Sequence, residues 1–185
     1  MTFNLIDGVR PAILARARKR REQTAAAVVS FSEAERRTAL SEIDRAYRVE
    51  IENELDEARG RCLFFEPSCA STIVESLNRN DGIEYELGAW TVMPNHVHVL
   101  FRLLDRSTLA QVIQACKSVS SHRINQLTGS RGSIWQADYF DTTMRDTRHL
   151  ARSVRYVVGN PGKAGLKDWQ WVFIDGERYG KWLGS

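Results

Sequence analysis

The sequence predicts an α+β fold, in which helices pack on one face of an antiparallel β-sheet. Residues 83–93 and 96–103 are rich in strand-forming side chains and are joined by Pro94–Asn95, which indicates an antiparallel hairpin. The expected order of elements is strand, helices, two strands, helix, strand, helix, which is typical of this class. With 185 residues, of which 43% are hydrophobic, we expect one domain spanning residues 1–185.

The first third of the chain predicts a short strand followed by helices. Residues 2–6 form the expected strand, and residues 10–23 form a helix that ends in a basic cluster. Residues 30–60 predict one or two acidic helices, and the pair Ser32 and Glu35 forms a capping box at their start. We therefore expect a helical elaboration over about residues 24–60, inserted after the first strand and helix.

The remaining elements follow from periodicity and turn residues. Helices are expected over residues 70–80 and 107–130, and a strand over residues 133–144. Residues 146–162 predict a further helix, with an Asp-Thr start and an Asn-Pro-Gly stop. Because a residue that precedes proline is biased out of the helical region, the direction of Asn160 stays open at this stage.

Charge is unevenly distributed along the chain. Residues 1–100 carry 13 Lys and Arg against 16 Asp and Glu, whereas residues 101–185 carry 13 against 7. A basic C-terminal half suits a polyanionic partner such as nucleic acid, although an ordinary uneven surface gives the same count. The basic cluster of the first helix has the same two interpretations, a phosphate-contacting surface or a solvated helix face: Arg16, Arg18, Lys19, Arg20 and Arg21.

Composition indicates a cytoplasmic protein. The chain has no run of 18 apolar residues and no signal peptide, so we expect neither membrane insertion nor secretion. The three cysteines are odd in number and match no metal-ligand spacing, which indicates reduced thiols.

Two histidines lie on one face of the strand predicted over residues 96–103. Strand residues alternate faces, so His96 and His98 share the face opposite Val97 and Val99, with Cα atoms about 7 Å apart. Imidazoles at this spacing can converge on one divalent metal ion. A pair of half-exposed strand histidines without function is the other interpretation.

The helix predicted over residues 146–162 carries a polar stripe away from its apolar face. Leu150, Val154 and Val157 recur at helical spacing and predict the buried face. The polar sector comprises His149, Arg152, Tyr156 and Asn160. Tyr156 and Asn160 are one turn apart, so their side chains are neighbours. The stripe forms either an active-site face or a solvated surface.

Three sequence blocks together resemble a known family. They are MPNHVHVLF at residues 93–101, GSIWQADYFDTTMRD at 132–146 and SVRYVVGNPGKAGL at 153–166. In this order the blocks look like the single-tyrosine HUH transposases, and in particular the REP-associated tyrosine transposases. Residues 1–23 also resemble the first strand and helix of this family. The resemblance implies a ferredoxin-like sheet, with the two histidines on a central strand.

The resemblance also implies roles for single residues. His96 and His98 match the metal ligands of the HUH motif, Asn160 matches the third ligand, and Tyr156 matches the catalytic tyrosine. The implied activity is cleavage and transfer of single-stranded or hairpin-forming DNA through a 5′-phosphotyrosine, with Mg²⁺ or Mn²⁺ as cofactor. Gly159 departs from the family pattern, because a bulkier residue is common there, and it could loosen the turn that aims Asn160.

Further residues are candidates for contacts with DNA. Trp135 could stack on an unpaired base or belong to the core. Tyr139 is a competing nucleophile, although no amide or arginine stripe accompanies it. The candidate phosphate contacts are Lys117, Arg123, Arg145 and Arg152, each of which is also typical of a solvated charge.

Three other functions remain open from the sequence. A ferredoxin-like sheet suits a non-catalytic nucleic-acid-binding module, which would not need the phenol of Tyr156. A metal phosphoesterase that uses water would cleave DNA without becoming attached to it. An inactive relative is the third. Nothing in the sequence decides between a monomer and a homodimer.

Overall fold

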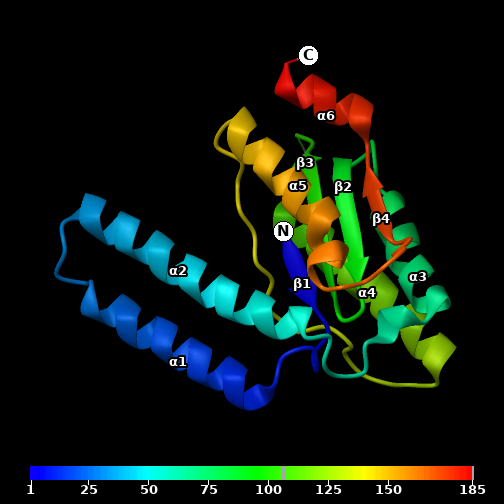
Figure 1. The fold of residues 1–185 in the computed structure, drawn as a ribbon, viewed down its shortest axis with the longest axis horizontal. Helices are drawn as coiled ribbons and strands as arrows, with labels where there is room; N and C mark the ends of the chain where they lie inside the picture. Colours follow the sequence, from blue (N-terminus) through cyan, green and yellow to red (C-terminus); the bar gives the residue numbers. More distant parts are fainter. Residues whose placement is uncertain (106, 185) are drawn as a thin grey trace. The chain divides into compact units, whose positions relative to one another are not determined.

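A computed structural model describes residues 1–105 and 107–184, which form two compact units (Figure 1). The sheet unit comprises Met1–Ile6 and the described residues from Cys62 onward, and the helical unit comprises Asp7–Arg61. The helical unit therefore includes all of the first helix, whereas the sequence placed the elaboration at about residues 24–60. No helix in the described part of the chain is long and apolar enough to cross a membrane.

The sheet unit is built on four antiparallel strands in the order β1-β3-β2-β4. Strands β2 (Tyr85–Met93) and β3 (His96–Leu103) form the predicted hairpin, and β1 (Thr2–Asn4) pairs with the other edge of β3. The α+β class and the antiparallel sheet are confirmed. Strand β4 (Val172–Ile174) pairs with β2 and was not anticipated from the sequence.

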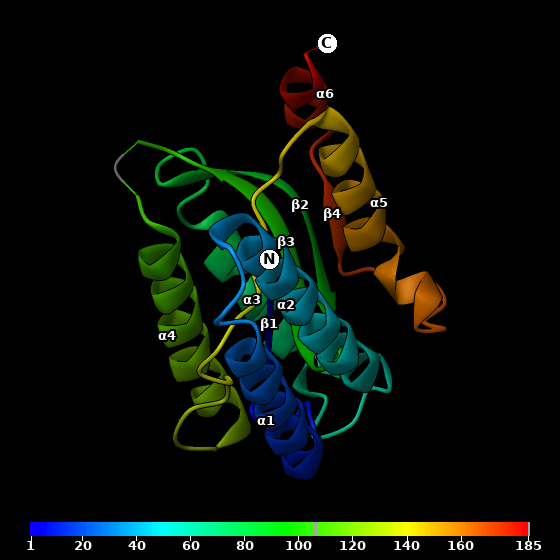
Figure 2. The same ribbon diagram turned by 90° about the vertical axis from the view of Figure 1, so that its left-hand side faces the viewer.

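Helices cover both faces of the sheet rather than the one face that the sequence predicts (Figure 2). The short 3₁₀ helix η1 (Leu63–Phe65), α3 (Pro67–Asn78) and α4 (Leu109–Thr128) belong to one face. Helices α5 (Thr147–Lys163) and α6 (Gly176–Leu183) lie on the other face. The sequence predicted helices in the regions of α3, α4 and α5, whereas η1 and α6 were not anticipated.

The alternation of β3 decides which core each of its side chains enters. Val97 and Val99 are fully buried in the larger core against α3 and α4. Leu100 faces the opposite way and packs with Leu150 and Val154 of α5. The two histidines share the face of Leu100, so they lie beneath α5 as the period of two requires.

The helical unit consists of α1 (Pro11–Ala27) and α2 (Glu33–Asp56). The predicted capping box is present, because the Ser32 hydroxyl accepts a hydrogen bond from the Glu35 amide and the Glu35 carboxylate accepts one from the Ser32 amide. These two bonds satisfy backbone donors that the first turn of a helix leaves free.

The basic cluster of α1 pairs with acidic residues of α2. Arg16 and Arg20 lie 3.8 and 3.3 Å from the carboxylate of Glu50, and Arg21 lies 2.6 Å from that of Asp44. Exposed ion pairs of this kind add little stability, but they neutralise much of the charge that a phosphate-contacting surface would need. These ion pairs favour a structural role for the basic cluster within the helical unit over a role as a phosphate-contacting surface.

The strand predicted over residues 133–144 is not a continuous strand. Two isolated antiparallel bridges join this segment to the first strand, Leu5 with Trp135 and Thr2 with Phe140. Between the two bridges the first strand covers three residue steps, from Leu5 to Thr2, whereas the facing segment covers five, from Trp135 to Phe140. The extra residues of the facing segment must therefore bulge out of the ladder. The segment still lines the β1 edge of the sheet.

Lys117 of α4 holds this bulge. Its ammonium group donates hydrogen bonds to the carbonyl oxygens of Gln136, Ala137 and Asp138 at 2.8, 3.1 and 3.1 Å. These three bonds use all three donors of the ammonium group. Each donor of the Lys117 ammonium group therefore binds a backbone carbonyl. A contact between Lys117 and a phosphate would require these hydrogen bonds to break.

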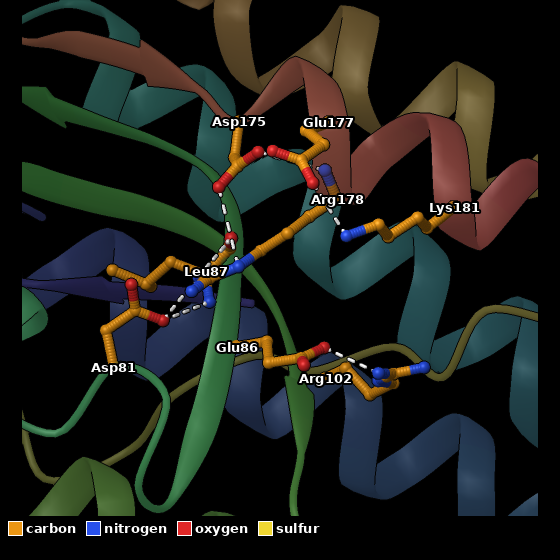
Figure 3. Close-up of polar contacts among 8 residues, drawn as sticks. All are labelled: Asp81, Glu86, Leu87, Arg102, Asp175, Glu177, Arg178 and Lys181. Atoms are coloured by element: carbon orange, nitrogen blue, oxygen red, sulfur yellow. Dashed lines mark hydrogen bonds and ion pairs between the residues drawn. The ribbon is translucent and has the colours of Figure 1, made fainter.

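The C-terminal helix α6 is fixed to the sheet at a β-bulge in β2 (Figure 3). The Arg178 guanidinium lies 2.5 Å from the Asp81 carboxylate and donates to the Leu87 carbonyl at 3.2 Å. Gly88, at the bulge, accepts a hydrogen bond from the Asp175 amide at 2.8 Å. A Cβ atom on Gly88 would lie 2.2 Å from the ring of Trp182, so only glycine lets this ring rest on the strand.

Two glycine-to-alanine substitutions should have opposite effects on stability. Gly88→Ala forces Trp182 away from β2 and should lower the free energy of unfolding by about 1–3 kcal/mol. At helical Gly159 an added Cβ meets nothing within 4 Å, so Gly159→Ala should raise it by roughly 0.5–1 kcal/mol. Urea unfolding of both variants checks this, and equal effects would contradict the packing described for Gly88.

Candidate active site

The histidine pair lies at the centre of the sheet, on the face covered by α5. His96 and His98 are each 1% exposed. In the sheet register His98 stands between Thr2 of β1 and Thr91 of β2. The Nε2 atoms of the two imidazoles face each other at 3.0 Å, with the ring planes at 84°. The pair is therefore convergent and shielded from water.

Each imidazole is oriented through its other nitrogen. Nδ1 of His96 lies 2.7 Å from the Asn95 side-chain oxygen, and Nδ1 of His98 lies 2.8 Å from the Thr2 hydroxyl. An amide oxygen only accepts, so it holds the His96 proton on Nδ1 and leaves a lone pair on Nε2. A hydroxyl both donates and accepts, so Thr2 can serve either tautomer of His98. Sequence reasoning missed Thr2, whose role arises only from the pairing of β1 with β3.

Burial keeps both rings neutral. Burial, together with the Lys163 ammonium, lowers the pKa of His96 to about 3. Burial, aided by neighbouring His96, also places the pKa of His98 well below its ordinary value. Neutral imidazole is the form that binds metal ions.

Tyr156 and Asn160 of α5 lie close to this pair, so Asn160 faces the interior and not away from the core as the helical spacing predicts. The Tyr156 ring meets the His98 ring edge-on with centroids 5.2 Å apart, and Tyr156 is 37% exposed. Asn160 is 1% exposed and lies close enough to His98 to raise the pKa of that ring slightly against the effect of burial. The helix continues through Pro161 to Lys163, so the expected bias of Asn160 out of the helix is wrong: packing on the sheet overrides it.

The amide of Asn160 is the strongest sign of a ligand in the described residues. Apart from its interaction with His98, neither its nitrogen nor its oxygen makes a hydrogen bond of ordinary geometry, although both atoms are buried. Leaving a polar group buried and unpaired is costly, so such groups point to a missing partner. No group of three or more His, Cys, Asp or Glu suited to a metal occurs in the described part of the chain, and the Asn160 amide is the candidate third donor beside the two imidazoles.

The donor set fits an octahedral divalent cation. Two ligands at right angles on such an ion, with bonds of about 2.1 Å, lie about 3.0 Å apart. This equals the separation of the two Nε2 atoms, His96 to His98. The side-chain oxygen of Asn160 would complete a set of two imidazoles and one amide. Three protein donors leave positions open for oxygen atoms of a substrate.

The other candidate residues lie outside this cluster. Trp135 is buried in the larger core, with its indole nitrogen donating to the Ser120 hydroxyl, which favours the core interpretation. Arg123 of α4 lies 2.6 Å from the Glu75 carboxylate. Arg145 and Arg152 are exposed, before and on α5. Tyr139 is partly buried, with the Lys117 ammonium 5.7 Å from the centre of its ring.

Residues 64–160 match the family described as Transposase IS200 like. This range covers more than half of the 185 residues and contains the histidine pair, the tyrosine and the buried amide. The chain belongs to the IS200-like transposase family. The match begins after the helical unit and ends at Asn160, so α1, α2 and α6 lie outside it.

Two relatives carry the REP-associated name. A Haemophilus influenzae protein assigned to the REP-associated tyrosine transposases is 26% identical over 102 residues, which are 46% of this chain and 56% of that protein. A solved structure of a REP-associated tyrosine transposase bound to a REP hairpin has a TM-score of 0.50 and 22% identity. It covers 62% of this chain and 68% of that one. This likeness shows that the transposase fold is shared.

The buried histidines should make stability depend on pH. In the unfolded chain a histidine takes up a proton below about pH 6.5, whereas His96 stays neutral in the fold down to about pH 3. Unfolding therefore binds protons in this window, and the free energy of unfolding falls as the pH falls. Between pH 7 and 5.5 we expect a loss of about 1 kcal/mol for each buried histidine.

Urea unfolding at a series of pH values measures this slope. His96→Asn should remove roughly half of the histidine contribution, whereas substitution of the exposed His122 of α4 should leave the slope unchanged. An unchanged slope in His96→Asn would show that the buried imidazole is not the origin of the pH dependence.

Proposed function

We propose that this chain is a metal-dependent DNA strand transferase, which cleaves single-stranded, hairpin-forming DNA and holds the cut end on Tyr156. The DNA class comes from the similarity to proteins of the REP-associated group, one of which was solved with a REP hairpin. The reaction type comes from the family and from the residues gathered at the histidine pair.

The observation that carries this proposal is the convergence of three kinds of group in one shielded place. A neutral histidine pair and an unpaired buried amide from Asn160 form a donor set for a divalent ion. A partly exposed phenol lies directly beside them. A cation bound there would withdraw negative charge from a phosphate and so favour attack on phosphorus.

In this proposed reaction Tyr156 provides the nucleophile. The Tyr156 oxygen attacks the scissile phosphorus, the bond to the 3′ oxygen breaks, and a 5′-phosphotyrosine and a free 3′-OH result. A free phenol ionises only near pH 10, so the proton of an attacking tyrosine must leave as the new bond forms. Because Tyr156 is 37% exposed, this proton can pass to water, and the departing 3′ oxygen takes one up.

The reverse reaction joins strands. A 3′-OH attacks the phosphotyrosine, a new phosphodiester forms and Tyr156 recovers its proton, so no bond energy is lost and no ATP is needed. Since Tyr156 lies against His98 of its own chain, the geometry supports a reaction within one chain.

Contacts with the DNA backbone are proposed for Arg145 and Arg152. Both are exposed: Arg152 lies one helical turn before Tyr156 on α5, and Arg145 immediately precedes this helix. The other three candidates are left out of the proposal, because Lys117 binds three carbonyls, Arg123 pairs with Glu75 and Trp135 is buried.

Covalent trapping tests the nucleophile. Labelled hairpin oligonucleotides from the DNA flanking the gene are incubated with the protein and Mn²⁺, and the products are separated under denaturing conditions. We expect a metal-dependent protein–DNA adduct that Tyr156→Phe reduces by at least 100-fold, because the attacking oxygen is gone. The matched control is Tyr139→Phe, which should retain the adduct.

The other outcomes each oppose the proposal. Cleavage without an adduct would indicate a phosphoesterase that uses water. Binding of hairpins without cleavage, unaffected by Tyr156→Phe, would indicate a binding module or an inactive relative. An adduct lost in Tyr139→Phe and retained in Tyr156→Phe would move the nucleophile to the other tyrosine.

A second prediction concerns affinity for the DNA backbone. Arg152→Gln should weaken hairpin binding and reduce the dependence of log K on log salt by about one unit of slope, because one phosphate contact is lost. Arg123→Gln is the control and should leave both quantities unchanged, since Arg123 pairs with Glu75. Fluorescence anisotropy titrations over about 50 to 200 mM salt measure both the hairpin affinity and its salt dependence. Equal slopes for wild type and Arg152→Gln would exclude this contact.

A further inference from the structure

A proline inside α5 leaves one carbonyl of the helix without its normal partner. In an α-helix each amide N–H binds the carbonyl four residues earlier. Pro161 has no N–H, and it lies inside α5, so the Val157 carbonyl lacks the donor that would normally bind it. Val157 itself is 5% exposed, so water does not readily replace the missing donor.

The sheet supplies the missing donor. The Thr91 hydroxyl of β2 donates a hydrogen bond to the Val157 carbonyl at 2.6 Å. Thr91 is fully buried, so this bond is not in competition with water. The bond joins residues 66 positions apart, and it is a direct polar link between α5 and the strand beneath it.

The position of this link relates it to the candidate active site. Thr91 is the cross-strand partner of His98, so both side chains lie on the same face of the sheet. On the helix, Val157 follows Tyr156 directly and precedes Asn160 by three residues. The link therefore fixes the turn that carries the phenol and the amide, at the strand position next to the histidine.

We propose that Thr91 is a positioning residue, which holds the Tyr156–Asn160 turn of α5 in register over the histidine pair. Pro161 is the second part of this device, because it frees the carbonyl that Thr91 binds. The effect on the reaction rests on the proposed strand-transferase function, whereas the effect on the position of the helix does not.

A thermodynamic cycle tests the bond itself. Pro161→Ala returns an N–H to the helix, so the Val157 carbonyl no longer depends on Thr91. Thr91→Val keeps the shape of the side chain and removes the hydroxyl. We expect Thr91→Val to destabilise the wild-type chain, and to destabilise Pro161→Ala markedly less, in urea unfolding. Equal losses in both backgrounds would overturn the assignment.

The rate of adduct formation tests the positioning. With saturating hairpin DNA and Mn²⁺, Thr91→Val should lower the rate about 10- to 100-fold and leave hairpin affinity unchanged, because the nucleophile is misplaced and the DNA surface is intact. Thr91→Ser restores the hydroxyl and should recover the rate to within about threefold of wild type. The matched control is Thr72→Val, which removes a buried hydroxyl that donates to the Ser68 carbonyl within α3.

An NMR readout keeps the two proposals distinguishable. The Tyr156 ring lies 5.2 Å from the His98 ring, so its resonances are sensitive to a shift of α5. They should move in Thr91→Val and stay in place in Thr91→Ser and Thr72→Val. If wild type forms no adduct and the resonances still move, the strand-transferase proposal fails and the positioning of the helix stands. If Thr91→Val behaves like Thr72→Val in both readouts, the positioning role is excluded.

Discussion

Burial of two neutral imidazoles on the central strand is the constraint on which the sheet unit depends. A histidine removed from water must find partners for both ring nitrogens, or its polar atoms are left unsatisfied at high cost. Asn95 contacts one nitrogen of His96, and Thr2 contacts one nitrogen of His98. The two remaining nitrogens face each other. The position of β1 is fixed in the same way, since Thr2 reaches His98 only from the neighbouring strand.

The position of α5 over the histidine pair follows from a similar requirement. Helix α5 has one apolar side, which packs on Ala89 and Leu100, and one polar side, which carries Tyr156 and Asn160. A helix can slide or rotate on an apolar surface at little cost, because such contacts are not directional. A hydrogen bond to a specific carbonyl is directional, and the Thr91 hydroxyl provides one at the centre of the helix. The proline that would weaken a free-standing helix here creates the point of attachment.

The parts of the chain outside the family match have separate structural explanations. Helix α6 is held by the ion pair of Arg178 with Asp81 (Figure 3). The close contact of Trp182 with Gly88 also holds it, and α6 thereby contributes to the second core. The helical unit, Asp7–Arg61, matches no part of the family range, and ion pairs join the basic cluster of α1 to Glu50 and Asp44 of α2.

The sequence by itself determined the features that are written in local patterns. The alternation of residues 96–103 placed both histidines on one face, and helical spacing placed Tyr156 beside Asn160. Only the tertiary structure decided which residues complete the site. Thr2 and Thr91 come from separate strands, and no spacing relates them to His98 before the sheet forms. Burial likewise decided that Trp135 belongs to the core and that the Asn160 amide is left without a partner, because solvent exclusion is a property of the packed chain and not of any one segment.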